Sequence, residues 1–495
     1  MSYSFENNFK VFVPEFFLVS CILLFLLYGS FFSFPVSRWS RHNRIIIYSS
    51  CFLGVFILSF TCCLLALNMH VRGVVFNCFF TCDSLSQNAK LILLICSLVC
   101  LLFSLSYSQR SKINSFEYYL LILLAVLGSL FLCSSSDLIS VYLAIELQSL
   151  CLYVLATYNR RSVYSTESGL KYFILGSFSS GLFLFGLSLV YALTGTTSFD
   201  NLRLFFSLYQ DNVLFLYIGY LFISCAFLFK LSAAPFHVWS PDIYDGAPLH
   251  STVFFAIVPN LGIFAALMRF LFCCFAHNFF FFQFIFLFSA VVSILLGSFL
   301  ALKQSKLKRL IAYSSISHVG YFLFAFSTAC VEGLHSSVVY LFIYMLTSVG
   351  IWGVFLSLYS FSVMNKARTL VDLTSMGRLH FGLSLSLAFF LFSAAGVPPL
   401  MGFYSKFYVF CNAINCGIYV FSFVIILSNV ISTFYYIRLI KILFFESDDI
   451  DFEIRPVVKE LSLTLGVCLF LLIFLFFNPN MLLLFSSESV LCLVG

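Results

Sequence analysis

Long runs of hydrophobic residues, separated by short polar stretches, recur from one end of the 495-residue chain to the other. Most runs are about 20 residues long, the length that an α-helix needs to cross a hydrocarbon layer. Continuous apolar runs argue against a transmembrane β-barrel, whose strands alternate apolar and polar positions. We expect an all-α integral membrane protein with fourteen transmembrane helices, centred near Leu23, Ile57, Leu98, Leu124, Ile145, Leu182, Ser224, Ile263, Ala290, Phe322, Met345, Phe392, Ile425 and Leu471.

The composition supports this fold class. Hydrophobic residues make up 62% of the chain and charged residues only 9%, whereas soluble domains carry about 25% charged residues. The first run, near Pro14–Ser33, lacks the basic start and the cleavage site of a signal peptide, so we expect it to remain as a helix. The 18 cysteines lie scattered in apolar runs. Without paired C-x-x-C motifs or spaced histidines, they predict small apolar side chains and no metal site.

Basic residues concentrate in alternate loops. Counted from the N-terminus, the odd loops hold 18 of the 26 lysines and arginines: Arg38, Arg41, Arg44, Arg110, Lys112, Arg160, Arg161, Lys303, Lys306, Lys308, Arg309, Lys366, Arg368, Arg378, Arg438, Lys441, Arg455 and Lys459. The even loops and tails hold Lys10, Arg72, Lys90 and Arg203. The positive-inside rule therefore puts the odd loops on the matrix or cytoplasmic side and both termini on the other. Basic residues spread in this way do not indicate nucleic-acid binding.

Two of the predicted spans contain helix-breaking residues. The seventh reads FLFKLSAAPFHVWSPDIYDGAP, with Pro235 five residues after Lys230. The twelfth reads LFSAAGVPPLMGFYSKFYVF, with Pro398 and Pro399 ahead of Lys406. Proline removes a backbone donor, and a membrane tolerates the freed groups only inside protein or along a hydrated cavity.

The two breaks are five spans apart, which suggests an internal repeat. We expect helices 4–8 and helices 9–13 to form two related five-helix bundles, inverted because five is an odd number. The predicted segments are 1–114 with three N-terminal helices, 115–275 and 276–443 with the two repeats, and 444–495 with a matrix loop and helix 14.

Glu146 and Lys230 each fall in the middle of a predicted span. A charge at the bilayer centre costs at least about 2.5 kcal/mol, so such residues have a partner or a function. A neighbouring carboxylate favours the ammonium form of a buried lysine, and burial disfavours it. A changed pairing between the two would therefore load or release one proton. The alternative is a static buried ion pair that fixes helix packing.

Three further residues are candidates for proton transfer. Lys406 follows the Pro-Pro break, where it can donate or accept a proton; the alternative is a lysine that extends its ammonium group to the membrane surface. His237 follows Pro235 in the opened part of the seventh span, and His318 lies among serines in the tenth. Histidine titrates near neutral pH and can relay protons, but a lone histidine can also be a hydrogen-bonded core residue.

Other charged residues have simpler interpretations. Glu167 and Lys171 stand four residues apart, which predicts an ion pair on one helix face. Asp137 and Asp242 lie near span ends as expected caps or loop anchors, and Arg269 is expected to extend toward the membrane surface. The sequence contains no phosphate-binding loop, dinucleotide fingerprint or metal-ligand spacing. We therefore expect no redox centre in this chain.

Several of these motifs resemble one family. SSSDLISVYLAIELQSLCLYVLATYNRRSVYSTESGLKYFILGSFSSGLFLFG, from Ser134 to Gly186, is similar to subunit 2 of mitochondrial NADH:ubiquinone reductase, or complex I. FLFKLSAAPFHVWSPDIYDGAP, LKRLIAYSSISHVGY, AAGVPPLMGFYSKFYVF and FYYIRLIK follow in the same order. The resemblance covers about residues 115–445 well, and it is strongest to plant and algal mitochondrial chains.

The resemblance implies a fourteen-helix, antiporter-like proton-channel subunit in the mitochondrial inner membrane, surrounded by lipid and by neighbouring antiporter-like subunits. It implies that Glu146 pairs with Lys230 and that Lys406 serves the outlet. It also implies no cofactor in this chain, with NADH, FMN, iron–sulfur clusters and ubiquinone bound by partner subunits.

One position departs from the family pattern. A lysine usually follows the proline of helix 8, but this chain has Asn260 after Pro259. An amide can hydrogen-bond water but cannot carry a proton at neutral pH. Three functions stay open: a proton-pumping subunit in which water or His318 bridges Lys230 and Lys406, a non-pumping structural subunit, and a subunit of an Mrp-type cation/proton antiporter.

Overall fold

The computed structural model describes residues 9–32, 41–111, 116–208, 214–275, 279–361, 369–374, 376–446 and 457–494. All fourteen predicted span centres lie inside helices of these ranges. The predicted segment boundaries at 114/115 and 275/276 touch residues outside the described ranges, as do five of the basic loop residues: Arg38, Lys112, Lys366, Arg368 and Arg455.

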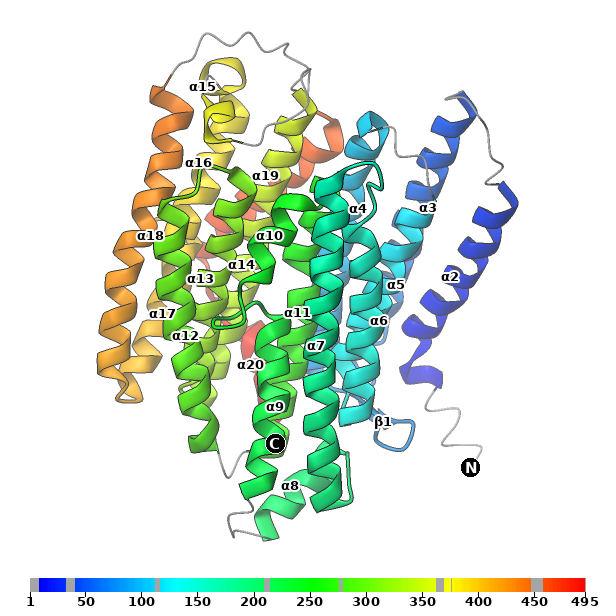
Figure 1. Cartoon of the computed structure of the whole chain (residues 1–495), viewed down its shortest axis with the longest axis vertical. Coiled ribbons are helices and arrows are strands. Elements are labelled where there is room, and N and C mark those ends of the chain that lie inside the picture. Colours follow the sequence, from blue (N-terminus) through cyan, green and yellow to red (C-terminus); the bar gives the residue numbers. More distant parts are fainter. Residues whose placement is uncertain are drawn as a thin grey trace. The chain divides into compact units, whose positions relative to one another are not determined.

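The chain divides into two compact units, and unit 1 comprises residues 1–231, 246–279 and 491–495. Its helices are α2 (Val13–Phe32), α3 (Arg41–Leu67), α4 (Ser84–Ser111), α5 (Glu117–Ser134), α6 (Leu138–Ala156), α7 (Val163–Thr194), α8 (Phe199–Leu208), α9 (Leu214–Lys230) and α11 (Leu249–Phe275) (Figure 1). A short antiparallel hairpin, β1 (Gly73–Val75) and β2 (Phe80–Cys82), pairs Gly73 with Cys82. The sequence had predicted a loop here, with Arg72 among its residues.

Unit 2 comprises residues 232–245 and 280–490. Its elements are α10 (Trp239–Gly246), α12 (Phe279–Leu302), α13 (Leu307–Phe326), α14 (Val331–Phe361), the 3-10 turn η1 (Leu370–Leu373), α15 (Met376–Leu379), α16 (Phe381–Ala395), α17 (Met401–Asn415), α18 (Tyr419–Phe445), α19 (Lys459–Phe477) and α20 (Asn480–Val494). The short helices α8, α10, α15 and α20 were not predicted as elements of their own.

Both predicted breaks are present. The seventh span ends as helix α9 at Lys230 and resumes as α10 at Trp239. The twelfth ends as α16 at Ala395, where Gly396 takes a left-handed conformation with φ 84°, and resumes as α17. Glycine adopts this conformation without steric cost, which makes it a common end for a helix.

Small residues allow close helix contacts in unit 1. A Cβ atom built on Gly186 of α7 would lie 2.6 Å from the carbonyl oxygen of Gly219 on α9. Only glycine permits this backbone approach, which is a common way to pack helices in a membrane. The contact positions α9, and therefore Lys230, against the rest of unit 1.

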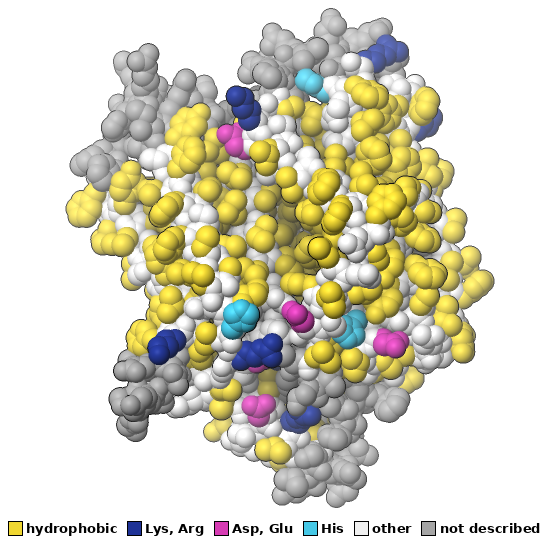
Figure 2. Space-filling view, turned by 180° about the vertical axis from the view of Figure 1, so that it is seen from behind, with side chains coloured by type: hydrophobic (Ala, Val, Ile, Leu, Met, Phe, Trp, Pro, Cys, Tyr) yellow, Lys and Arg dark blue, Asp and Glu magenta, His cyan; other side chains and the backbone are white. Residues whose placement is uncertain are grey.

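The surface is suited to a lipid environment. Figure 2 shows a face covered mostly by hydrophobic side chains with few charged groups. Large apolar residues such as Leu24, Phe178 and Phe423 are about 60% exposed or more. In water, such side chains would form large hydrophobic patches that promote aggregation. Among the described residues, eleven helices are long and apolar enough to cross a membrane, and three shorter apolar helices accompany them. The protein is therefore a multi-pass helical membrane protein.

Candidate functional site

Lys230 ends α9 with a side chain that is only 8% exposed. Its Nζ donates a 3.4 Å hydrogen bond to the hydroxyl of Tyr153 on α6 and lies 5.8 Å from the centre of that ring. A buried ammonium ion needs compensation for the water it has lost. One long hydrogen bond and an aromatic face compensate it only weakly.

Glu146 is the carboxylate that acts electrostatically on Lys230. It lies on α6 seven residues before Tyr153, or about two helical turns, and therefore on the same face. The side chain is half-buried and lies within electrostatic range of Lys230. None of the ion pairs among the described residues joins the two, so the expected direct pairing stays a prediction. In this conformation Glu146 acts on Lys230 through space, and Tyr153 makes the contact.

Tyr153 is held in place by close packing. Its ring lies edge-on to Tyr172 of α7, with centroids 4.7 Å apart. The hydroxyl end lies against Gly176 of α7, where there is no room for a Cβ atom. At the start of α6, the Asp137 carboxylate accepts from the backbone N–H of Ile139, which confirms the predicted cap. The orientation of the Lys230 contact is thus fixed by the packing of α6 against α7.

Asn260 occupies the position where the family pattern has a lysine. It lies buried on α11 after Pro259, and its Nδ2 donates to the carbonyl oxygen of Ala256 at 3.1 Å. The amide is thus bonded to its own helix. The amide does not titrate at neutral pH. None of the described hydrogen bonds joins it to Lys230.

Lys406 lies on α17 just after the second break and is 5% exposed. Its Nζ donates to the side-chain oxygen of Asn429 on α18 at 2.8 Å and to the carbonyl oxygen of Ala395 at 3.0 Å. Ala395 ends α16, so the ammonium group caps the negative end of a half-helix. The ring of Tyr321 lies 5.1 Å from Nζ. Among the described contacts, only uncharged groups stabilise this ammonium ion.

His318 on α13 is bonded at both ring nitrogens. Nδ1 lies 2.7 Å from the hydroxyl of Tyr340 on α14, and Nε2 lies 3.1 Å from that of Tyr436 on α18. A neutral imidazole donates with one nitrogen and accepts with the other, whereas a hydroxyl can do either. Both tautomers are therefore compatible with this arrangement, and each ring nitrogen has a hydroxyl with which it can exchange a proton.

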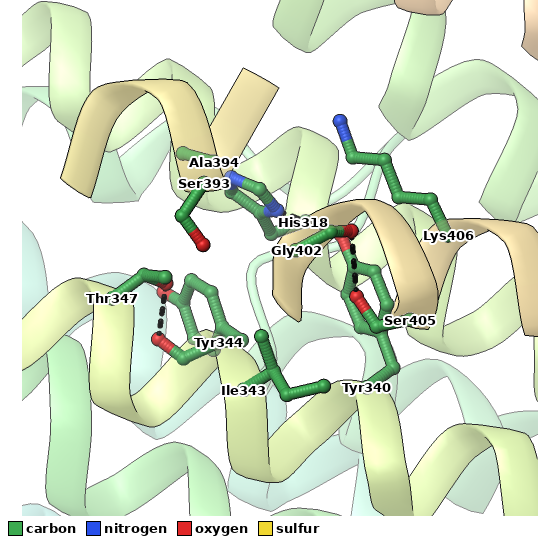
Figure 3. A pocket seen from close by; sticks show the side chains of 10 residues that line it. All are labelled: His318, Tyr340, Ile343, Tyr344, Thr347, Ser393, Ala394, Gly402, Ser405 and Lys406. Atoms are coloured by element: carbon green, nitrogen blue, oxygen red, sulfur yellow. Dashed lines mark hydrogen bonds between the residues drawn. The ribbon is translucent and has the colours of Figure 1, made fainter. Parts of the chain in front are cut away.

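A small cavity joins His318 to Lys406 (Figure 3). The enclosed space is about what a single water molecule needs. The wall also includes Tyr340, Tyr344 and Ser405. Both ring nitrogens of His318 are already bonded to tyrosine hydroxyls, so a water here would meet the hydroxyl groups of the cavity wall.

His237 lies between α9 and α10 and is half-buried. Its carbonyl oxygen accepts from the backbone N–H and the hydroxyl of Ser240 at 3.2 Å. No described contact brings its imidazole to Lys406 or His318, so its relay role stays a prediction. The following helix α10 is anchored by Asp245, which pairs with Lys306 at 2.7 Å and with Arg309 at 3.1 Å.

The remaining buried charges correct two predictions. Lys90, counted above as a loop residue, lies inside α4 and forms an ion pair with Glu15 of α2. Arg269 does not extend to the surface, because its guanidinium is buried against Thr81 and pairs with Asp83 at 3.1 Å. These pairs attach α2 and α11 to α4 and its preceding loop. The exposed pair between Glu167 and Lys171 is confirmed at 2.8 Å.

Comparison with known proteins identifies the family. Residues 135–432, more than half of the chain, match the family described as "NADH:quinone oxidoreductase/Mrp antiporter, TM". The chain belongs to this family.

Full-length relatives within it are similar throughout. NADH-ubiquinone oxidoreductase chain 2 of Marchantia polymorpha is 38% identical, over 99% of both chains. NADH-quinone oxidoreductase subunit N of Paramagnetospirillum magneticum is 40% identical over 80% of this chain and 82% of its own.

Solved structures have the same fold. A chain of respiratory complex I from Thermus thermophilus, solved with bound aureothin, is 26% identical with a TM-score of 0.78, covering 95% of this chain and 98% of its own. A chain of the Mrp complex from Dietzia sp. has a TM-score of 0.84 at 15% identity, covering 99% and 98%. This second likeness concerns the fold alone.

Four contacting residues were missed by sequence reasoning. Tyr153 could have been found, because it lies two turns from Glu146 on the same helix face. Asn429 could also have been found as a polar residue within an apolar span. Nothing in the sequence singled out Tyr340 or Tyr436. These tyrosines lie 22 and 118 positions from His318, the residue to which they are hydrogen-bonded.

Proposed function

We propose that this chain is a proton-translocating membrane-arm subunit of an NADH:quinone oxidoreductase, in which Lys230 and Lys406 take up and release protons. The names of its full-length relatives support the complex. The observation that carries the proposal is a buried ammonium group at each of two helix breaks, neither in contact with a carboxylate among the described residues. A cation so weakly compensated changes its protonation when a nearby charge moves.

In unit 1, Glu146 supplies that nearby charge. Movement of its carboxylate toward Lys230 stabilises the ammonium form, and movement away favours release of the proton. Tyr153 can pass a proton through its hydroxyl while its ring stays fixed. Moving one charge against 100 mV costs about 2.3 kcal/mol, which a rearranged carboxylate–lysine contact can supply. Quinone reduction in partner subunits would drive the carboxylate.

In unit 2, the transfer groups are Lys406, His318 and its two tyrosines. One water in the cavity beside Lys406 would connect to the imidazole through the hydroxyl of Tyr340, which lines the cavity and is bonded to His318. His237 would pass the proton toward Lys406. The proton then leaves on the side away from the basic loops.

The proposed topology has fourteen spans built around two inverted five-helix repeats. Similar local geometry at the two breaks supports the repeat: Ser232 (φ 56°) and Gly396 (φ 84°) are both left-handed, and a proline follows each by three residues, at 235 and 399. We place the chain in the mitochondrial inner membrane with both termini in the intermembrane space. Its partners are other complex I subunits, which hold NADH, FMN, iron–sulfur clusters and ubiquinone.

The test is the proton-to-electron ratio of the intact complex in sealed vesicles. Lys230→Met should lower the ratio, because methionine fills similar space but cannot carry a proton. Lys171→Met is the matched control, since that lysine is 45% exposed in a surface ion pair, and it should leave the ratio unchanged. An unchanged ratio in the Lys230 variant would remove this residue from the proton path.

A non-pumping structural role is the second candidate, and Asn260 favours it. Its amide is bonded to the Ala256 carbonyl and offers no titratable group at the centre of α11. This role predicts that Asn260→Lys raises the proton-to-electron ratio, whereas Lys230→Met has no effect. Sodium-dependent transport without NADH would instead indicate an Mrp-type antiporter.

A further inference from the structure

Two cysteines far apart in the sequence meet at one end of unit 2. Cys330 lies in the turn between α13 and α14, and Cys416 in the turn between α17 and α18. Their sulfur atoms are 3.1 Å apart. Cys330 is exposed and Cys416 is half-buried. The two thiols are therefore in contact, and a reagent in water can reach them.

The backbone around both cysteines holds them in this position. Ala329 (φ 59°) precedes Cys330, and Gly417 (φ 77°) follows Cys416, so each turn contains a left-handed residue next to its cysteine. The two turns are also connected by a separate hydrogen bond, from Asn412 Nδ2 on α17 to the carbonyl oxygen of Glu332 on α14, at 2.9 Å. The thiols thus face each other without help from a covalent bond.

We propose that Cys330 and Cys416 form a reversible disulfide that connects the α13–α14 turn to the α17–α18 turn. A disulfide bond is about 2.05 Å long, so the sulfur atoms need to approach by only about 1 Å. A shift of that size is within the ordinary motion of surface turns. This redox site is separate from the proton-transfer groups proposed above.

The reaction is a two-electron oxidation, and hydrogen peroxide is a suitable oxidant. The Cys330 sulfur attacks one peroxide oxygen, the O–O bond breaks, and a sulfenic acid and one water form. The Cys416 sulfur then attacks the Cys330 sulfur, the S–O bond breaks, and the second water leaves. Both thiol protons end in the two waters. A dithiol reductant returns both cysteines to thiols.

Exposure assigns the two roles. Cys330 is the sulfur that an oxidant dissolved in water reaches first. Burial raises the pKa of the Cys416 thiol to about 11, with the neighbouring Cys330 and Glu332 acting in the same direction. The thiolate is the form that attacks peroxide, so the raised pKa of Cys416 leaves the first attack to Cys330.

The bond would restrain the helices around the second lysine. Cys330 stands between α13, which carries His318, and α14, which carries Tyr340. Cys416 follows α17, which carries Lys406. Oxidation would hold the ends of these helices at a fixed separation, about 15 Å along α17 from Lys406.

The test uses the intact complex and peptide mass spectrometry. The complex is treated with hydrogen peroxide, its free thiols are alkylated, and it is digested without reductant. We expect one linked peptide pair that contains Cys330 and Cys416, and we expect dithiothreitol to separate it. Separate peptides after peroxide, each alkylated or oxidised beyond sulfenic acid, would overturn the proposal.

Variants give the matched controls. Cys330→Ser and Cys416→Ser should each abolish the linked pair. Cys78→Ser should leave it unchanged, because Cys78 is also exposed but lies in unit 1. If a serine variant fails to assemble, the wild-type complex alone still decides the question. The readout is a chemical bond, so it does not depend on proton translocation.

Discussion

The two helix breaks hold a lysine in different ways. At the first, Lys230 ends α9, where it contacts a tyrosine hydroxyl and has Glu146 within electrostatic range. At the second, Lys406 follows the break and is bound by an amide oxygen and by the last carbonyl of α16. The first lysine thus faces a titratable charge, and the second faces fixed dipoles.

This difference suggests a division of roles. A carboxylate can move or change its protonation, so Lys230 suits the step at which a signal from elsewhere in the complex arrives. Backbone and amide dipoles cannot change charge, so Lys406 suits a step that responds to its neighbour His318 and to water. The helix break itself is similar in both places, and the residues around it set the behaviour of each lysine.

The largest effect on stability is expected where the two helices on either side of the second break, α16 and α17, contact each other. Gly402, the second residue of α17, lies against the backbone oxygen of Ser393, and a Cβ atom there would overlap that oxygen. Gly402→Ala should therefore lower the free energy of unfolding by about 3 kcal/mol, measured as a fall in the thermal midpoint of the complex. Gly382→Ala is the control, because its Cβ meets nothing within 4 Å. Equal midpoints for the two variants would contradict this packing.

A smaller effect is expected from the amide that binds Lys406. Asn429→Leu removes the acceptor at 2.8 Å, and a hydrogen bond to a charged group contributes about 1.5–3 kcal/mol. Asn429→Asp should recover this stability and give the second lysine a carboxylate like that of the first. Thermal unfolding of both variants makes the comparison. A stable leucine variant would mean that Asn429 does not support the ammonium group.

The smallest effect is expected at Tyr153. Tyr153→Phe removes one long hydrogen bond and keeps the ring, so it should cost about 0.5 kcal/mol of stability. The turnover of the complex should fall clearly although its stability changes little. The reason is that the hydroxyl is the only group that accepts a hydrogen bond from Lys230 Nζ among the described residues. Tyr191→Phe, at an exposed position on α7, is the control. Equal turnover in the two variants would leave Tyr153 with a packing role only.

The sequence predicted most of the helices because bilayer thickness fixes their length and lipid fixes their polarity. Both breaks were predictable from proline, since its missing N–H has few tolerated places in a membrane. The β-hairpin at Gly73–Cys82 was not predictable in the same way, because its two strands have only three residues each and its mostly apolar sequence, GVVFNCFFTC, shows no alternation of apolar and polar positions. The short helix α20 was missed because the preceding apolar run already accounted for a span.

Side-chain partners were harder to predict than helices. The burial of Lys90 and Arg269 depends on Glu15 and Asp83, which are distant in sequence from them. Sequence position near a span end suggested solvent for both, and tertiary pairing decided otherwise. The tyrosines around His318 were unpredictable for the same reason. The position of a tyrosine in the sequence does not indicate which distant residue its hydroxyl will contact.

The most direct test replaces each break lysine with arginine and measures the proton-to-electron ratio of assembled complex. Arginine keeps the positive charge but does not release its proton in proteins. If the lysines carry protons, Lys230→Arg and Lys406→Arg should each lower the ratio even where the complex assembles normally. If the ratio stays at the wild-type value in both variants, the two lysines are static charges and the proposed proton path is wrong.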